Sequence, residues 1–222
     1  VFMFVFGGLA KIPTDGIPQA LFYLSGITLW NYFSETLTKT SDTFLTNQAI
    51  FGKVYFPRLI APLSITLTGL IKMFIQFGLF VIVYIWFAVK GVDVKPNLHA
   101  MLFPVLLLIL ANLSLGFGII ISSMTTKYRD LKFLIAFAVQ LLMYATPVIY
   151  PLSVMQGSYS KYMWLIQANP VTAVMETFKY GFLGQGTFTW LSLGYSVLFS
   201  FVILFLGIIV FNKVERNFMD VI

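Results

Sequence analysis

Charged residues are scarce in this chain. Only 10% of the 222 residues are Asp, Glu, Lys or Arg, while 59% are hydrophobic, whereas soluble domains carry roughly 25% charged residues. Because so apolar a surface is unfavourable in water, the composition excludes an ordinary soluble domain and indicates that the lipid bilayer is the solvent. The net charge of +6 therefore indicates cationic loops near anionic lipid headgroups rather than nucleic-acid binding.

Several catalytic signatures are also missing. Cysteine is absent, which excludes disulfides and thiol chemistry, and the only histidine, His99, is expected to be solvated in an outer loop. Neither an H-E-x-x-H motif nor a positioned Ser and His is present, which argues against a membrane-embedded protease. The phosphate-binding pattern G-x-x-x-x-G-K-[ST] is missing too. We expect no catalytic residues, no metal and no cofactor on this chain, so any ATP and Mg would have to be bound by a partner.

Long apolar segments recur along the chain. Each has close to the ~20 residues that a helix needs to cross a bilayer, and the alternating pattern of membrane strands is absent. The expected fold is all-α, a single polytopic transmembrane domain over 1–222 with six spans. Residues 1–10 are interpreted as the outer half of a first span that begins upstream, and the five full spans are expected at 17–38, 63–89, 100–122, 131–150 and 188–211.

Lysine and arginine in short loops predict the orientation. If the C-terminal tail is cytoplasmic, the inner loops hold Lys39, Lys53, Arg58, Lys127, Arg129, Lys132, Lys213 and Arg216, and the outer loops hold Lys11, Lys90, Lys95, Lys161 and Lys179. The excess on one side predicts that both termini of the full-length protein are cytoplasmic. This scheme requires residues 151–186 to return to the side from which they start.

The returning segment contains a clear helix start. Asn169 is a good N-cap, Pro170 is favoured at the first helical position, and Gly184 is suited to end the helix. Together with an apolar helix over about 153–168, it predicts a re-entrant hairpin over about 153–184. The alternative is a pair of helices lying flat at the membrane surface, anchored by Tyr159, Tyr162 and Trp164.

Three stretches, in this order, carry a family resemblance. They are NQAIFGKVYFPRLIAPLS (47–64), TTKYRDLKFL (125–134), and PVIYPLS with ANPVTAVMETFKYGFLG (147–153 and 168–184). The chain resembles, over almost its whole length, the permease subunit of type-2 ABC exporters for polysaccharides or polyol phosphates, a group that includes O-antigen, capsule and teichoic-acid exporters. An exporter of drugs or small lipids with the same architecture is the alternative.

The resemblance implies partners, location and activity. It implies a homodimer in the bacterial plasma (inner) membrane that recruits two cytoplasmic ABC ATPase subunits. The subunit would export a lipid-linked polysaccharide or polyol phosphate through a conduit at the dimer interface.

The cytoplasmic loop over about 46–58 is the candidate ATPase-coupling loop. It reads as a short amphipathic helix broken by Pro57, and helix-in-groove docking needs aromatic anchors of this kind. The predicted contact residues are Phe51, Lys53, Tyr55, Phe56 and Arg58. An interfacial helix that only obeys the positive-inside rule is the alternative.

Aromatic side chains suggest the conduit and prolines suggest its gate. An aromatic plane and polar neighbours can hold a sugar weakly at many places, which suits conduction; the plain alternative is packing in the core or against lipid. The predicted conduit lining is Tyr23, Trp30, Tyr32, Phe33, Tyr144 and Tyr150. The predicted gate hinge is Pro147, Pro151, Asn169 and Pro170.

Glu35 and Lys72 are charged residues within the second and third predicted spans. Isolated charges there cost at least ~2.5 kcal/mol each on insertion scales. We therefore expect Glu35 and Lys72 to form an intramembrane ion pair between the second and third spans, or to face a polar conduit.

Overall fold

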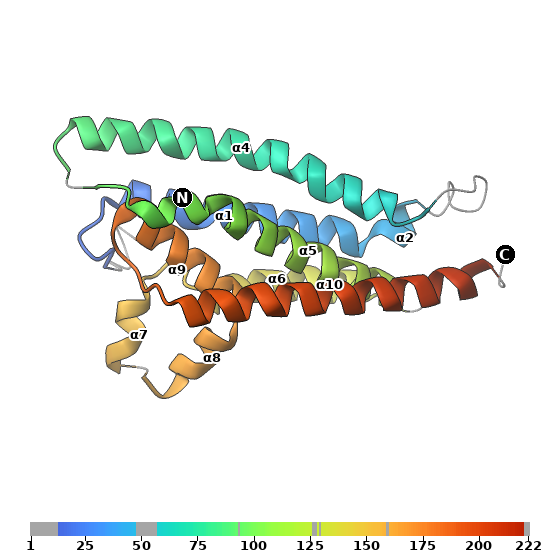
Figure 1. Ribbon diagram of the computed structural model, residues 1–222. Helices are drawn as coiled ribbons and strands as arrows, with labels where there is room; N and C mark the ends of the chain where they lie inside the picture. Colours follow the sequence, from blue (N-terminus) through green and yellow to red (C-terminus); the bar gives the residue numbers. More distant parts are fainter. Residues whose placement is uncertain are drawn as a thin grey trace.

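The computed structural model describes residues 13–47, 57–92, 94–125, 128, 130–158 and 160–219, with side chains undescribed at 156–158, 160 and 215–219 (Figure 1). Regular structure in these ranges is entirely helical, with no strand among them, which confirms the all-α fold class. The long helices run side by side along the molecule, and the short ones gather at its ends (Figure 1). The long helices are α1 (Gln19–Ser41), α4 (Ile60–Val89), α5 (Phe103–Thr125), α6 (Leu131–Tyr144) and α10 (Trp190–Met219).

The connections gather at opposite ends of the bundle. At one end, Thr125 Oγ1 donates to the Ser41 carbonyl, and Lys132 forms an ion pair of 2.8 Å with Asp42. The short helix α2 (Thr43–Thr46) lies at this end, as does the C-terminal end of α10 (Figure 1). These are the segments for which the sequence predicts a common side.

The opposite end holds the other set of connections. Here the Asn97 N–H donates to the Gly181 carbonyl, and Ser153 Oγ donates to Asp15 at 2.8 Å. The 3₁₀ helix η2 (Leu98–Leu102) lies at this end, as do the helices α7 (Leu152–Ser158), α8 (Met163–Ala168) and α9 (Pro170–Leu183) (Figure 1). The described connections between successive long helices therefore alternate between the two ends of the bundle, as expected for helices that each cross the membrane once.

Three helices in the described part of the chain are long and apolar enough to cross a bilayer: Ile60–Val89, Leu98–Thr125 and Trp190–Val214. The helix α1 is 23 residues long but does not qualify, because Asn31, Ser34 and Glu35 lower its hydropathy. The helix α6 has only 14 residues, which cover about 21 Å, less than the ~30 Å hydrocarbon core.

The helix α6 ends earlier than the sequence led us to expect. We predicted a span over 131–150, whereas the helix stops at Tyr144 and turns follow. Proline explains the shortfall, because Pro147 has no N–H to donate and disfavours helical backbone at Thr146. The last six residues of the predicted span therefore belong to a bend rather than to a helix.

Close packing of α5 against α1 and α10 forms the centre of the bundle. A Cβ atom at Gly116 of α5 would lie 2.8 Å from the Leu204 nitrogen of α10, and one at Gly207 would lie 2.8 Å from the Gly116 carbonyl oxygen. Only glycine permits this approach of two backbones. The outer helices are less covered: α4 buries few of its side chains and faces outward with residues such as Ile75, which is 70% exposed. An apolar outer face of this kind suits lipid or a second subunit.

The helix α9 (Pro170–Leu183) is anchored by a cluster of aromatic rings. Phe178 and Phe182, with ring centroids 4.6 Å apart, pack against Phe77 of α4 and Phe103 of α5, which are themselves stacked at 4.3 Å. Such ring pairs contribute about 0.5–1.5 kcal/mol beyond the area that they bury. This cluster fixes α9 against the long helices.

Both predicted caps of α9 are present. Asn169 accepts a hydrogen bond from the Val171 N–H, and Gly184 ends the helix with a left-handed φ of 73°. The preceding segment differs from the single helix that we predicted over 153–168. It consists of α7 (Leu152–Ser158), the 3₁₀ turn η3 (Ser160–Tyr162) and α8 (Met163–Ala168). The sequence GSYS at 157–160 accounts for the break, because Gly and Ser favour turns over helix interiors.

Candidate functional site

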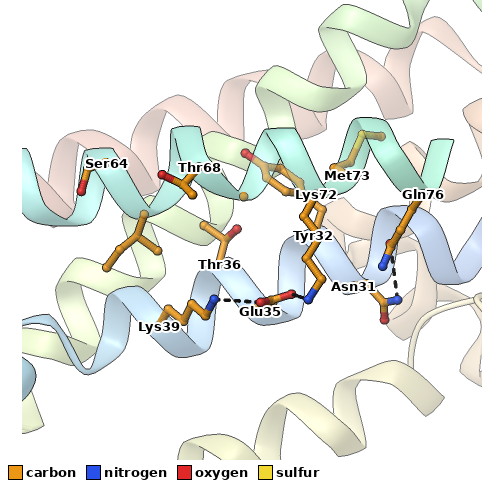
Figure 2. Close-up of a pocket in the computed structure, with 12 residues that line it drawn as sticks. Asn31, Tyr32, Glu35, Thr36, Lys39, Ser64, Thr68, Lys72, Met73 and Gln76 are labelled. Atoms are coloured by element: carbon orange, nitrogen blue, oxygen red, sulfur yellow. Dashed lines mark hydrogen bonds and ion pairs between the residues drawn. The ribbon is translucent and has the colours of Figure 1, made fainter. Parts of the chain in front are cut away.

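A polar groove runs between α1 and α4 (Figure 2). Its volume is about 250 Å³. It gives α4, whose outward face carries exposed apolar residues such as Ile75, a polar side toward α1. The side chains that line it are Asn31, Tyr32, Glu35, Thr36, Lys39, Ser64, Ile65, Thr68, Lys72, Met73 and Gln76, together with Gly69.

Helical spacing explains why the groove is continuous. On α1, Asn31, Glu35 and Lys39 recur every four residues, and on α4 the polar positions are 64, 68, 72 and 76. Residues four apart lie one above the other on the same helix face. The two polar stripes face each other across the groove (Figure 2), and the Asn31 amide donates to the Gln76 side chain at 3.5 Å.

Glu35 is the centre of the charged cluster. Its Oε1 lies 2.8 Å from Lys39 Nζ on the same helix, and its Oε2 lies 2.5 Å from Lys72 Nζ on α4. The pairing of Glu35 with Lys72 that we expected from the sequence is thus present. The Glu35 side chain is 33% exposed and the two lysine side chains are about 60% exposed, so the cluster is an open one and carries a net positive charge.

The polar surface continues on the other side of α1. A second groove of about 440 Å³ lies between α1 and α6, and Ser34, Thr38 and Gln140 line it. Glu35 and Lys39 line both grooves. The exposed face of α1 between α4 and α6 is therefore polar from Asn31 to Lys39, a surface that can contact a hydrophilic molecule inside the membrane.

The aromatic side chains of α1 do not lie where we predicted. Tyr23, Trp30, Tyr32 and Phe33 are at most 4% exposed and belong to the main hydrophobic core. Among them, Trp30 lines the groove between α1 and α6, and Tyr32 lines the groove between α1 and α4. Large rings fill the space between packed helices, so in this conformation the polar face of α1, rather than its aromatic face, is open. The predicted lining is therefore corrected for Tyr23 and Phe33, which line neither groove.

The two remaining aromatic residues lie at the bend after α6. Tyr144 is 52% exposed, and Tyr150 is half-buried and donates its hydroxyl to the Tyr144 carbonyl at 3.2 Å. They lie at the end of the bundle that also holds α7, α8 and α9. A role in lining a conduit stays a prediction.

The predicted hinge is a tightly bonded joint in this structure. The Asn169 amide donates to Thr146 Oγ1 at 2.9 Å, and that hydroxyl donates to the Leu142 carbonyl. Lys179 Nζ donates to the Pro147 carbonyl at 2.5 Å. The start and the middle of α9 thus both hold the bend. Gly26 of α1 allows the bend to pack closely against α1, because a Cβ atom at this position would lie 2.6 Å from the Val148 carbonyl oxygen.

Sequence reasoning missed the buried ion pair of this joint. Glu176 and Lys179 are each 3% exposed, and their charged groups lie 3.8 Å apart. The Lys179 ammonium also lies 4.1 Å from the centre of the Phe22 ring. Burial disfavours the charged form of each group, and their mutual attraction offsets part of that cost.

A sequence signal for that pair did exist. We had assigned Lys179 as an outer-loop cation, yet Glu176 and Lys179 are three residues apart in a helical, largely apolar stretch, where charged residues indicate a structural or functional site. His99 is another departure from expectation. It is half-buried, and its ring centroid lies 4.5 Å from that of Phe188, whereas we expected a solvated side chain.

Most of the predicted coupling loop lies outside the described residues. This holds for Phe51, Lys53, Tyr55 and Phe56. Arg58 is described and is only 4% exposed, so it packs into the protein at the start of α4 rather than standing at an open rim.

The fold and the grooves define a class, the multi-pass helical membrane protein with a polar surface between apolar helices. Within that class, the family model described as "ABC-2 type transporter" matches residues 1–183. The chain therefore belongs to the ABC-2 type transporter family.

Curated relatives extend the similarity over the rest of the chain. An O-antigen export system permease protein RfbA from Klebsiella pneumoniae is 25% identical over 231 residues, covering 100% of this chain and 82% of the relative. A protein of the same name from Myxococcus xanthus is 25% identical over 169 residues, covering 76% of this chain and 63% of the relative.

Proposed function

We propose that this chain is the transmembrane subunit of an ATP-driven exporter of a lipid-linked polysaccharide of the O-antigen type. The observation that carries the proposal is the polar face of α1, which opens into grooves toward both α4 and α6. The similarity to O-antigen export permeases over the whole chain supports the substrate class. A hydroxyl-rich polymer needs such a surface, because hydrocarbon offers its hydroxyls no hydrogen bonds.

The proposed arrangement is a homodimer with six spans per subunit in the bacterial inner membrane. In the full-length protein both termini face the cytoplasm, and the end of the bundle with α2 and the C-terminal end of α10 is the cytoplasmic end. The polar faces of the two copies line a conduit at the dimer interface. Weak contacts spread along its length let the polymer move without being trapped.

ATP and Mg are bound by two separate cytoplasmic ABC ATPase subunits. The absence of a phosphate-binding loop from the sequence supports this division of labour. The loop over about 46–58 docks on the ATPase through its aromatic residues, and α4, which follows it, carries the movement to the groove at Lys72.

The bend after α6 and the helices α7 to α9 form the outer gate. Pro147, Pro151, Asn169 and Pro170 mark its joints, and the bonds from α9 to the bend hold it closed at rest. Re-entrant backbone is tolerated at membrane depth where protein covers it. The burial of α9 among α1, α5 and α10 is consistent with that requirement.

Purification from native membranes tests the proposal. The tagged full-length protein should bring down an ATPase subunit in equal amount, and Tyr55→Ala should reduce its recovery. Recovery of the permease without any ATPase contradicts the proposed function.

A single cysteine tests the gate, since the chain has none of its own. Leu165 of α8 is 57% exposed, and Leu165→Cys should cross-link to its copy under oxidation and block export. Reduction should restore export. Export that continues at full rate in the cross-linked dimer shows that α8 only anchors the protein at the surface.

A further inference from the structure

A second polar site lies at the outer end of the bundle, apart from the α1–α4 groove. It is a cleft of about 530 Å³ between α8, α9 and the beginning of α10. This volume falls in the 300–1,000 Å³ range of ligand pockets. The side chains that matter for its chemistry are Trp164, Gln167, Thr172, Glu176, Ser192 and Tyr195.

Two aromatic side chains supply its apolar surface. Trp164 is 67% exposed and Tyr195 is 39% exposed. The Tyr195 hydroxyl donates to the Ala168 carbonyl at 2.9 Å, so its ring is fixed in place by the end of α8. The two rings offer planar surface beside polar groups, which is the combination that a sugar ring, with apolar C–H faces and polar edges, can use.

Two buried oxygen atoms of the cleft residues have no hydrogen-bond partner among the residues that the structure describes. They are Glu176 Oε1 and Thr172 Oγ1, on side chains that are at most 3% exposed. The other Glu176 oxygen accepts from the Thr187 N–H at 3.0 Å and from its hydroxyl. Lys179 lies 3.8 Å from Oε1, beyond hydrogen-bond distance, and donates to Pro147 instead. Buried polar groups are normally satisfied, so a hydroxyl donor that reached these two atoms from the cleft would supply hydrogen bonds that the described residues do not make.

We propose that this cleft binds one sugar ring of the exported glycan, through Trp164 and Tyr195 on its faces and Glu176 with Thr172 on its hydroxyls. This inference rests on the proposed function for its substrate class. It adds a binding subsite outside the conduit, at its exit. This subsite can hold the sugar that has left the conduit first while the following sugar of the same polymer moves through the conduit.

The lining chemistry argues against other ligands. A lipid acyl chain has no donor for the two unsatisfied oxygens. A phosphate group would meet the Glu176 carboxylate, and none of the described residues that line the cleft is Lys or Arg. A cationic headgroup fits the aromatic rings, but Lys179 already lies beside the Glu176 carboxylate, so no second cation is needed for its charge.

Saturation-transfer NMR tests this inference on the full-length protein in a detergent without a sugar headgroup. The probes are the methyl glycosides of mannose, galactose, glucose and N-acetylglucosamine, each at millimolar concentration, with choline as the cationic comparison. At least one glycoside should receive saturation. Trp164→Ala should weaken its binding at least about fivefold, and Thr172→Val, which keeps the side-chain shape, should weaken it as well.

Trp190→Ala is the matched control. Trp190 is 68% exposed, close to the value for Trp164, and packs on Phe188 rather than lining the cleft, so its loss should leave glycoside binding unchanged. No saturation of any glycoside, equal binding by Trp164→Ala, or saturation of choline alone overturns the inference. If glycan export persists in those cases, the proposed function stands and only the subsite fails; if the protein exports no glycan at all, the proposed function fails.

Discussion

The two charged clusters, at Glu35 and at Glu176, use the same residue types in opposite ways. In the groove, Glu35 is one-third exposed and contacts two lysines from α1 and α4 that are about 60% exposed. At the joint, Glu176 and Lys179 are both buried, and the lysine also contacts a carbonyl and an aromatic ring. An open ion pair contributes little to stability, whereas breaking a buried pair leaves a desolvated charge behind.

This difference separates two tasks. The exposed charged side chains of the groove can exchange one ion-pair partner for another, so they are available to a molecule that passes through it. The joint cannot lose a partner without cost, so its charges hold the bend after α6 against α9. Substitutions at the joint should therefore act first on stability, and substitutions in the groove should act first on transport.

The largest effect is expected for Lys179→Met. It leaves the Glu176 carboxylate buried without a cation and the Pro147 carbonyl without its donor, and should destabilise the protein by about 3–5 kcal/mol. Thermal unfolding of the purified protein measures this. Lys161→Met, at an exposed lysine of the same outer segment, is the control and should be silent. Equal stability of the two variants would show that the buried pair does not hold the joint.

A smaller loss is expected for Asn169→Ala, about 1–2 kcal/mol. This change removes the N-cap of α9 and the amide bond to Thr146. Asn169→Asp separates the two contributions, because it keeps the capping oxygen but has no N–H for Thr146. Its stability, measured in the same way, should lie between those of the wild type and the alanine variant. An aspartate variant as stable as the wild type would assign the whole effect to the cap.

The smallest stability effect is expected for Glu35→Gln, below about 1 kcal/mol. Export should nevertheless fall, because the groove loses its only carboxylate among the lining residues that the structure describes. Reversing both charges, as Glu35→Lys with Lys72→Glu, should recover part of the export by restoring the pair. If Glu35→Gln and Lys72→Gln each leave export at the wild-type rate, the cluster has no part in transport.

Features that depend on neighbouring residues in the sequence were predicted better than features that depend on contacts between distant segments. Both ends of α9 were predictable, because Asn169, Pro170 and Gly184 act through their own backbone neighbourhood. The pairing of Glu35 with Lys72 was also within reach, since two opposite charges on adjacent apolar helices have few other partners.

Helix rotation and tertiary burial were not predictable. Asn31, Tyr32, Phe33 and Ser34 are consecutive residues of α1, and the sequence does not show which of their side chains point into the core. The packing of α4 and α5 against α1 determines that Tyr32 and Phe33 are buried. Lys179 resembled a loop cation because its burial depends on Phe22 and on the Pro147 bend, which are distant in sequence. The same dependence on packing hid the cleft of Thr172 and Glu176.

Reconstitution tests the central claim most directly. Proteoliposomes that contain the full-length protein and its co-purified ATPase receive a lipid-linked glycan on the ATPase side, and a lectin or glycosidase measures its arrival on the other side. The account predicts transfer that requires both the ATPase and hydrolysable ATP. Equal transfer without ATP or without the ATPase, or ATP-dependent transfer of small lipids but not of glycan, would contradict it.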